Sequence, residues 1–147
     1  PAAEGTLSKA AGNVITLTFD AAVPAGAAVD VVAIGGDDVT AGFTFTPDGD
    51  TLVVAEQGQV LTNRTWYRLT PAAGFDAEPF TVDVCTLIGD ADGSGQVLPA
   101  ALSAIWARKL QYTTDRVDID GSGQILPADL SAAWAHKLES KPAKPGE

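Results

Sequence analysis

Hydrophobic and polar residues alternate in short runs through the first 85 residues of the chain. The runs are rich in β-branched and aromatic residues, and turn residues such as Pro47-Asp48-Gly49-Asp50 separate them. A period of two places successive side chains on opposite faces of a strand, so each run predicts a strand with one buried face. Several short strands separated by turns are typical of an antiparallel β-sandwich. We therefore expect strands at residues 14–19, 29–34, 39–46, 51–55, 65–70 and 80–84.

The pattern changes after residue 85, where a stretch of 21 residues occurs twice. Residues 90–110 and 118–138 are offset by 28 positions and are identical at 16 of 21 positions. Each copy opens with acidic residues at alternate positions, continues through a glycine and ends in an apolar run with helical spacing. This order is that of a calcium-binding loop followed by a helix. We expect a small all-α domain made of two such repeats.

The second copy contains a complete set of calcium ligands. Calcium binds about six to eight oxygen atoms, which a loop of this type supplies from alternate positions and from its twelfth residue. Gly123 stands where the loop turns sharply, and Pro127 stands where a helix begins and its missing N–H costs little. The expected ligands are Asp118, Asp120, Ser122, the carbonyl of Gln124, a water near Leu126, and Asp129.

The first copy lacks one of these ligands, because Ala101 occupies its twelfth position. Two carboxylates remain in this loop against three in the second. Since calcium affinity follows the number of charged ligands, we expect the first site to be weaker, partly hydrated or empty. Its remaining candidate ligands are Asp90, Asp92, Ser94 and the carbonyl of Gln96.

Composition narrows the classes of function. The formal net charge of −10 over 147 residues argues against binding to nucleic acid or to an anionic membrane surface. No stretch approaches the ~20 apolar residues of a membrane helix, and the single cysteine, Cys85, excludes an intrachain disulfide. We divide the chain into a sandwich at 1–85, a calcium-binding domain at 86–140 and a disordered tail at 141–147. The abrupt start at Pro1 suggests a fragment of a longer protein.

The first part resembles the bacterial Ig-like modules of surface and secreted enzymes. The segments VITLTFDAAV, DVTAGFTFTPDGDTLVV and LTNRTWYRLTP carry this resemblance. The second part resembles a dockerin, on the segments DADGSG and DIDGSG and on Asp129 at the twelfth position. It departs from the family at Ala101, and its helices contain tryptophan where familiar dockerins often have lysine or arginine. An Ig-like module directly before a dockerin is similar to the X-module–dockerin pairs of cellulosome-like systems.

The dockerin resemblance implies a function. Dockerins bind cohesin modules of scaffold proteins, so the chain would attach a parent protein to a multi-protein complex outside a bacterial cell or on its surface. Carbohydrate contact would then come through the parent protein. The near-identity of the two copies leaves open one or two docking orientations. By analogy, the residues that face the cohesin are Pro99, Ala100, Trp106, Ala107 and Gln111 in the first copy, and Pro127, Ala128, Trp134, Ala135 and Glu139 in the second.

Packing offers a different explanation for two of these residues. Leu102, Trp106 and Leu110 follow the spacing of one helical face, as do their counterparts in the second copy, so the tryptophans fit a buried stripe equally well. We also weigh a carbohydrate-binding or adhesion appendage, in which the calcium half is a structural clamp. Trp66 and Tyr67 lie on opposite faces of one predicted strand, so one of them would be exposed. An enzyme is disfavoured, because His136 is the sole histidine and sits on a predicted surface helix.

Overall fold

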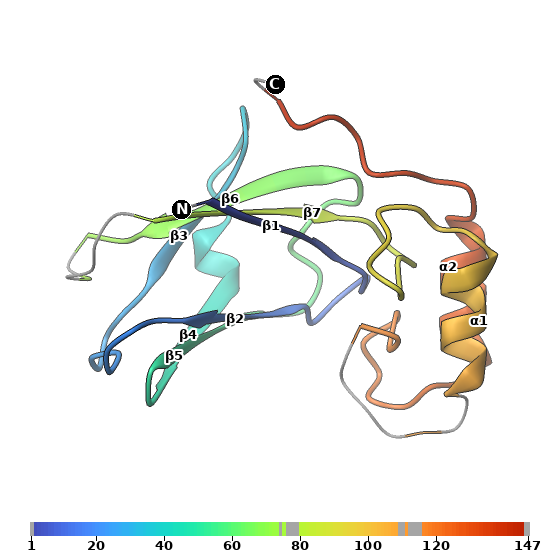
Figure 1. Ribbon diagram of the computed structural model, residues 1–147, viewed down its shortest axis with the longest axis horizontal. Coiled ribbons are helices and arrows are strands. Elements are labelled where there is room, and N and C mark those ends of the chain that lie inside the picture. Colours follow the sequence, from blue (N-terminus) through green and yellow to red (C-terminus); the bar gives the residue numbers. More distant parts are fainter. Residues whose placement is uncertain (1, 74, 76–79, 109–110, 112–115, 146–147) are drawn as a thin grey trace.

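The computed structural model describes residues 2–73, 75, 80–108, 111 and 116–145. A β region of two sheets comes first, and a small part with two helices follows it. Figure 1 shows the two sheets facing each other as layers, with the helices side by side at one end of the molecule. Among the described residues, no helix has the length and apolar character needed to cross a membrane.

The two sheets have four and three strands. The first sheet has the order β1-β7-β6-β3, and the second has the order β2-β5-β4. Strand β1 runs parallel to β7, whereas the other pairs are antiparallel. The strands are β1 (Ala2–Leu7), β2 (Val14–Thr18), β3 (Val29–Ala33), β4 (Phe43–Asp48), β5 (Thr51–Glu56), β6 (Thr65–Pro71) and β7 (Thr81–Thr86), with a 3₁₀ turn, η1 (Thr40–Gly42), before β4.

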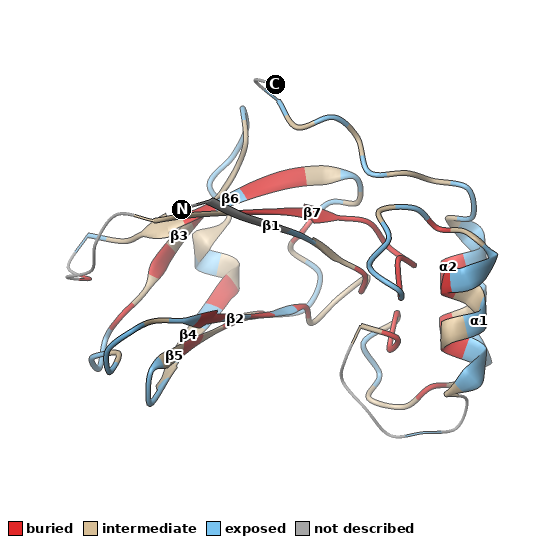
Figure 2. Cartoon of the chain, in the orientation of Figure 1, coloured by how far each residue is buried: buried red, intermediate tan, exposed pale blue. Residues whose placement is uncertain are grey.

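The hydrophobic core of the β region lies between the sheets, as the buried segments in Figure 2 show. On β2, Ile15 and Leu17 are buried and the residues between them are exposed, which is the alternation that the sequence predicts. Their partners on β5, Val54 and Leu52, are fully buried. Burying one such aliphatic side chain contributes about 1.5–3 kcal/mol. The alternation of buried and less buried residues along β2 and β5 therefore determines which face of this sheet packs against the other sheet.

The predicted sandwich needs three corrections. Strand β1 is absent from the prediction, and its parallel pairing means that the β region is not wholly antiparallel. The run at 39–46 is a strand only from Phe43, because η1 precedes it. Neither Trp66 nor Tyr67 is exposed, since they are 4% and 2% accessible. The hydroxyl of Tyr67 accepts a hydrogen bond from the N–H of Thr62, and Trp66 is covered by the end of the chain.

The two helices form a second core. Helix α1 (Pro99–Ala107) and helix α2 (Pro127–Ala135) each begin at the proline that the sequence places there. They pack against each other through small and branched side chains that are almost completely buried, namely Ala101, Ile105 and Ala133. Leu110, which we grouped with Trp106, lies outside the described residues.

Direct contacts join the β region to the two-helix part. The N–H of Ala10 donates to the carbonyl of Ile119 at 2.6 Å. Asn63 makes three contacts across the boundary: its Oδ1 accepts the N–H of Ile88, and its Nδ2 lies 2.8 Å from Oε1 of Glu139 and 3.2 Å from Nδ1 of His136. These contacts hold the loops of the second part against one end of the sandwich.

The last described residues also cross this boundary. The indole N–H of Trp66 donates to the carbonyl of Pro142. The ammonium groups of Lys141 and Lys144 lie 5.1 and 5.5 Å from the centroid of the same ring. Lys144 Nζ also lies 2.9 Å from Oδ2 of Asp83 on β7. Lys141, Pro142 and Lys144 thus contact the β region, and they belong to the segment 141–147 that we expected to be a disordered tail.

Candidate metal centre and helical face

Three carboxylates converge in the second loop. Asp118, Asp120 and Asp129 each offer an oxygen, and these oxygens lie within 4.8 Å of one another. Two oxygens that bind one calcium ion at about 2.4 Å lie at most about 4.8 Å apart. The loop therefore brings its first, third and twelfth residues to the separation that one ion requires, although the last of them is on helix α2.

The carboxylate of Asp118 is completely buried. Its Oδ2 accepts the N–H of Gly123 at 2.9 Å and lies 3.7 Å from the ammonium of Lys9. Its Oδ1 accepts no hydrogen bond from any residue that the structure describes. A buried carboxylate oxygen without a partner is costly, so Oδ1 of Asp118 needs a cation or a water that comes from outside the chain.

Asp129 joins the loop to the helix. Its Oδ2 accepts the N–H of Leu126, the residue before α2, and its Oδ1 accepts the N–H of Asp120. Both bonds satisfy donors that the helix start and the loop would otherwise leave unpaired. Burial raises the pKa of Asp129, although these two backbone donors oppose the shift and the charge of Asp120 adds to it. A cation placed among the three carboxylates would relieve their repulsion.

The neutral ligands of the second loop also face one another. The hydroxyl of Ser122 donates to the carbonyl of Gln124 at 3.0 Å, and the N–H of Ser122 donates to Oδ1 of Asp120. The structure thus brings all five predicted protein ligands of this loop into one chain of contacts. Carboxylate, hydroxyl and carbonyl oxygens are the donors that calcium prefers. The acidic cluster of the second loop can therefore hold a metal ion.

The first loop has glycines with similar φ angles to those of the second, but a different set of contacts. Ser94 donates to the carbonyl of Gln96 at 3.0 Å, as in the second loop, and the N–H of Ser94 donates to Oδ1 of Asp92. Ala101 is fully buried in the helical core and offers no oxygen. Both carboxylate oxygens of Asp90 accept hydrogen bonds from the protein. The first loop therefore brings two carboxylates together, and it has no counterpart of Asp129, the third carboxylate of the second loop.

All but one of the predicted partner-binding residues are exposed. Trp106 and Trp134 are 54% and 55% exposed, so they are not part of the buried helical core. The ammonium of Lys137 lies 4.7 Å from the centroid of the Trp134 ring. Pro99, Ala100, Ala107, Gln111, Pro127, Ala128 and Ala135 are also exposed, whereas Glu139 is half-buried and bonded to Asn63.

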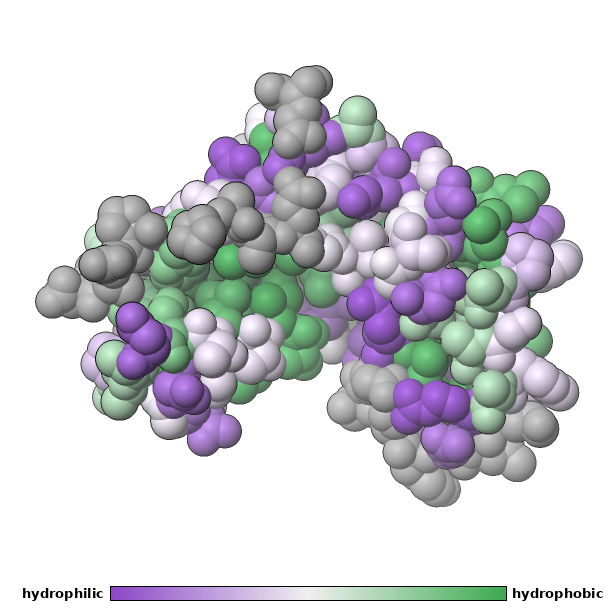
Figure 3. Space-filling view, viewed as in Figure 1, coloured by the Kyte–Doolittle hydropathy of each residue, from purple (hydrophilic) through white to green (hydrophobic). Residues whose placement is uncertain are grey.

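An apolar groove lies between the two helices on this surface. Its volume is about 580 Å3. Hydrophobic atoms appear in Figure 3 along the edge of the molecule where Figure 1 places α1 and α2. Three pairs of residues that are equivalent in the two copies line the groove, together with Ala107: Leu102 and Leu130, Ser103 and Ser131, and Trp106 and Trp134.

Sequence analysis missed several residues of these sites. Lys9 and Asn63 lie far from the loops in the sequence, and no local pattern connects them with the residues they contact. Ser103 and Ser131 recur at the same place in both copies, and this was a signal that could have identified them. Cys85 is buried, and burial raises the pKa of its thiol to about 11, which fits a packed strand residue and not a reactive one.

No protein-family model matches the chain, and no curated protein matches it. The assignment of a function therefore depends on the residues of the second loop and the groove, and on the resemblance carried by the repeated segments.

Proposed function

We propose that the chain is a non-catalytic, calcium-dependent docking module that binds a cohesin through its two-helix face. In this proposal the β region is an Ig-like or X-type module and residues 86–140 are a dockerin. The module would attach a parent protein to a scaffold outside a bacterial cell or on its surface. The observation that carries the proposal is the groove between two exposed tryptophans, which equivalent residues of both copies line beside a calcium-type loop.

In this proposal calcium connects the second loop to helix α2. When bound, it would neutralise the carboxylates of the second loop and hold the loop to the start of α2. Asp129 contributes to both, because its side chain lies in the acidic cluster and also accepts the N–H of Leu126. The position of α2, and with it one wall of the groove, thereby depends on the state of the loop. Calcium sites of extracellular modules are typically filled at about 0.1–1 mM.

The groove suits a protein partner. Exposed apolar patches rimmed by polar residues mark interaction surfaces, and tryptophans dominate the binding energy of many protein interfaces. Trp106 and Trp134 keep more than half of their surface open, and serine hydroxyls between them can bond to a partner backbone. The carbohydrate alternative has less support, because Trp66 and Tyr67 are both buried and offer no stacking surface.

Binding to a panel of cohesins, measured by calorimetry with calcium and with EDTA, tests the proposal. We expect Trp106→Ala and Trp134→Ala each to weaken binding, and the double variant to abolish it. Loss of an anchoring tryptophan typically costs about 2 kcal/mol or more, whereas folding stability should change by less than about 0.5 kcal/mol at such exposed sites. Val14→Ala, an exposed apolar change on the sandwich, is the matched control. Binding that survives EDTA or the double variant would refute the proposal.

The single variants also address the number of docking orientations. If the two copies present equivalent surfaces, each single variant should retain one orientation and lose affinity to a similar extent. A large loss from one variant and none from the other indicates a single orientation.

A further inference from the structure

The first aspartates of the two loops differ in how their oxygens are satisfied. Both carboxylates are completely buried. In the second loop, Oδ1 of Asp118 accepts no hydrogen bond from the described residues. In the first loop, Oδ1 of Asp90 accepts the N–H of Ser94 at 2.9 Å, and Oδ2 accepts the hydroxyl of Thr6 at 2.6 Å and the N–H of Gly95 at 3.0 Å. Both carboxylate oxygens of Asp90 therefore have donors from the protein, whereas Oδ1 of Asp118 has none among the described residues.

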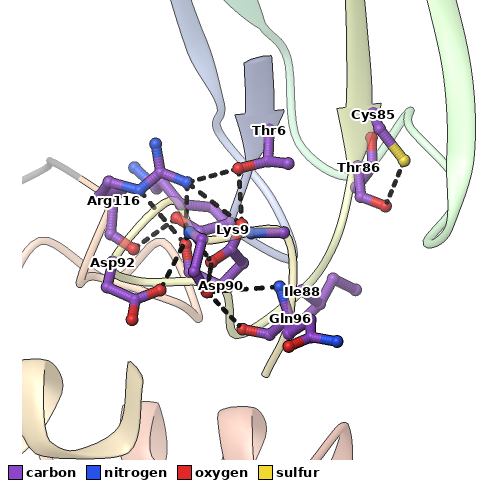
Figure 4. Close-up of polar contacts among 12 residues, drawn as sticks. Thr6, Lys9, Cys85, Thr86, Ile88, Asp90, Asp92, Gln96 and Arg116 are labelled. Atoms are coloured by element: carbon purple, nitrogen blue, oxygen red, sulfur yellow. Dashed lines mark hydrogen bonds and ion pairs between the residues drawn. The ribbon is translucent and has the colours of Figure 1, made fainter. Parts of the chain in front are cut away.

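An arginine completes the contacts of the first loop. Nη2 of Arg116 lies 3.8 Å from Oδ2 of Asp90 and donates to the hydroxyl of Thr6 at 2.8 Å. Nη2 and Nε also donate to the carbonyl of Asp90, at 2.8 and 3.2 Å. Figure 4 shows Thr6, Asp90 and Arg116 joined by these bonds. At the same offset of 28 positions, the residue before the first copy that corresponds to Arg116 is Ile88, so the repeat itself does not require this guanidinium.

Charge separates the two loops further. The second loop has three carboxylates and the ammonium of Lys9 near one of them, which leaves two negative charges for a divalent ion. The first loop has two carboxylates, and the guanidinium of Arg116 leaves one. Ala101 adds only a buried methyl group where a carboxylate would complete the site. Since calcium affinity follows ligand charge and number, the first loop offers too little of both.

The end of the chain holds the first loop from another side. The N–H of Lys141 donates to the carbonyl of Gly95 at 2.8 Å. The N–H of Val97 donates to the carbonyl of Glu139, and the carbonyl of Val97 accepts the N–H of Leu138, at 2.8 and 2.7 Å. The loop is therefore bonded to β1 through Thr6, to Arg116 just before the second copy, and to residues 138–141.

We propose that the first loop binds no calcium and acts as a metal-independent joint, in which Arg116 and Thr6 replace the ion and fix the helices to the sandwich. The chain then binds one calcium ion, in the second loop. The count of one ion rests on the proposed calcium site, whereas the claim about the first loop stands by itself.

Calcium titration of the full chain, with bound ions counted by calorimetry and native mass spectrometry, tests this inference. We expect one ion per chain. We expect no bound ion in Asp118→Asn or in Asp129→Ala. The second of these variants gives the twelfth position of the second loop the alanine that the first loop has there. An ion retained by both variants would lie in the first loop and would overturn the inference, as would two ions in the unmodified chain. No ion in the unmodified chain would overturn the proposed calcium site and leave the first-loop claim supported.

A stability measurement tests the role of Arg116 without metal. In EDTA, Arg116→Met should lower the urea midpoint of unfolding, because Asp90 would keep its buried charge and lose its cation. Arg108→Met, which removes an arginine bonded to exposed Gln111, is the matched control. Restoring the missing carboxylate should also turn the first loop into a calcium site. We therefore expect the double variant Arg116→Met and Ala101→Asp to bind a second ion. An unchanged midpoint for Arg116→Met in EDTA would overturn the assigned role.

Discussion

The ammonium of Lys9 lies 3.7 Å from Oδ2 of Asp118, so a residue of the β region places a fixed positive charge beside the candidate calcium loop. Both side chains are buried, with 7% and 0% of their surface accessible. A calcium ion among Asp118, Asp120 and Asp129 would lie within a few ångströms of this charge. The β region therefore sets the electrostatic environment of the second loop, and calcium affinity should depend on it.

Replacing Lys9 by methionine should raise the calcium affinity of the second loop. Methionine keeps the apolar stem and removes the charge. A single and a double charge about 6 Å apart repel by roughly 1.4 kcal/mol even in a water-like medium, and burial of both side chains lowers the screening, so we expect binding to tighten by at least about tenfold. Calorimetric titration at low ionic strength measures the effect, which salt should weaken only slightly because both side chains are buried.

Lys137→Met provides the control for the Lys9 experiment. Lys137 follows the last turn of α2, whereas Asp129, the ligand nearest to it in the chain, lies in the first turn, so the two are eight residues apart. At 1.5 Å per residue this distance is about 12 Å, beyond the screening length of about 8–10 Å. Equal effects from the two variants would show that net charge, and not the position of Lys9, controls affinity.

The features that the sequence predicts correctly are local. The alternation of Ile15 and Leu17 with exposed neighbours specifies a strand, and the repeated acidic segments specify two loops, because each depends on residues close together in the chain. Strand β1 was missed because its segment, AAEGTL, has no such alternation and pairs with β7 far along the chain. Its place is set by tertiary pairing, which local propensity does not encode.

The same limit applies to the tryptophans. Leu102 and Trp106 have the spacing of a buried stripe, yet Ala101 and Ile105 fill the space between the helices and leave Trp106 outside. Trp66 is the opposite case, since its burial depends on chain that follows the repeats. The elements that pack against an apolar face decide whether it becomes buried, and the local pattern of a single sequence does not identify those elements.

Gly121 of the second loop lies against Ala11 of the β region, and we expect Gly121→Ala to disturb this contact. A Cβ there would lie 2.8 Å from the carbonyl oxygen of Ala11, and the backbone has a φ of +76°. The positive φ costs an alanine about 1–2 kcal/mol, and separating the loop from Ala11 should bring the total loss of unfolding free energy to roughly 2–4 kcal/mol. Urea unfolding in EDTA measures the loss.

Gly123→Ala is the control that separates the cost of the positive φ from the cost of the contact with Ala11. Gly123 is in the same loop and has a φ of +90°, but a Cβ there meets nothing within 4 Å. It should therefore show the backbone cost alone. If the two variants lose the same stability, the contact between Gly121 and Ala11 contributes nothing.

The ion pair between Asp83 and the cations around it should make stability depend on pH in the acid range. Nε and Nη2 of Arg68 donate to the two carboxylate oxygens at 2.8 and 2.9 Å, and Lys144 lies 2.9 Å from one of them. The Arg68 guanidinium lowers the pKa of Asp83 from 3.8 to about 2, against the opposing effect of burial. Because the folded pKa is below the unfolded value, the contribution to stability is complete above about pH 4 and is lost as the pH falls towards 2.

Unfolding free energies measured between pH 6 and pH 2 for the unmodified chain and for Asp83→Asn test this dependence. We expect the difference between the two to be largest at pH 6 and to shrink by about 1–2 kcal/mol as Asp83 becomes protonated. Asp37→Asn, at an exposed turn, is the control and should leave the profile unchanged. Lys144→Met should reduce the pH dependence only in part, because Arg68 remains bonded to Asp83. Parallel profiles for the unmodified chain and Asp83→Asn would mean that the ion pair does not stabilise the folded state.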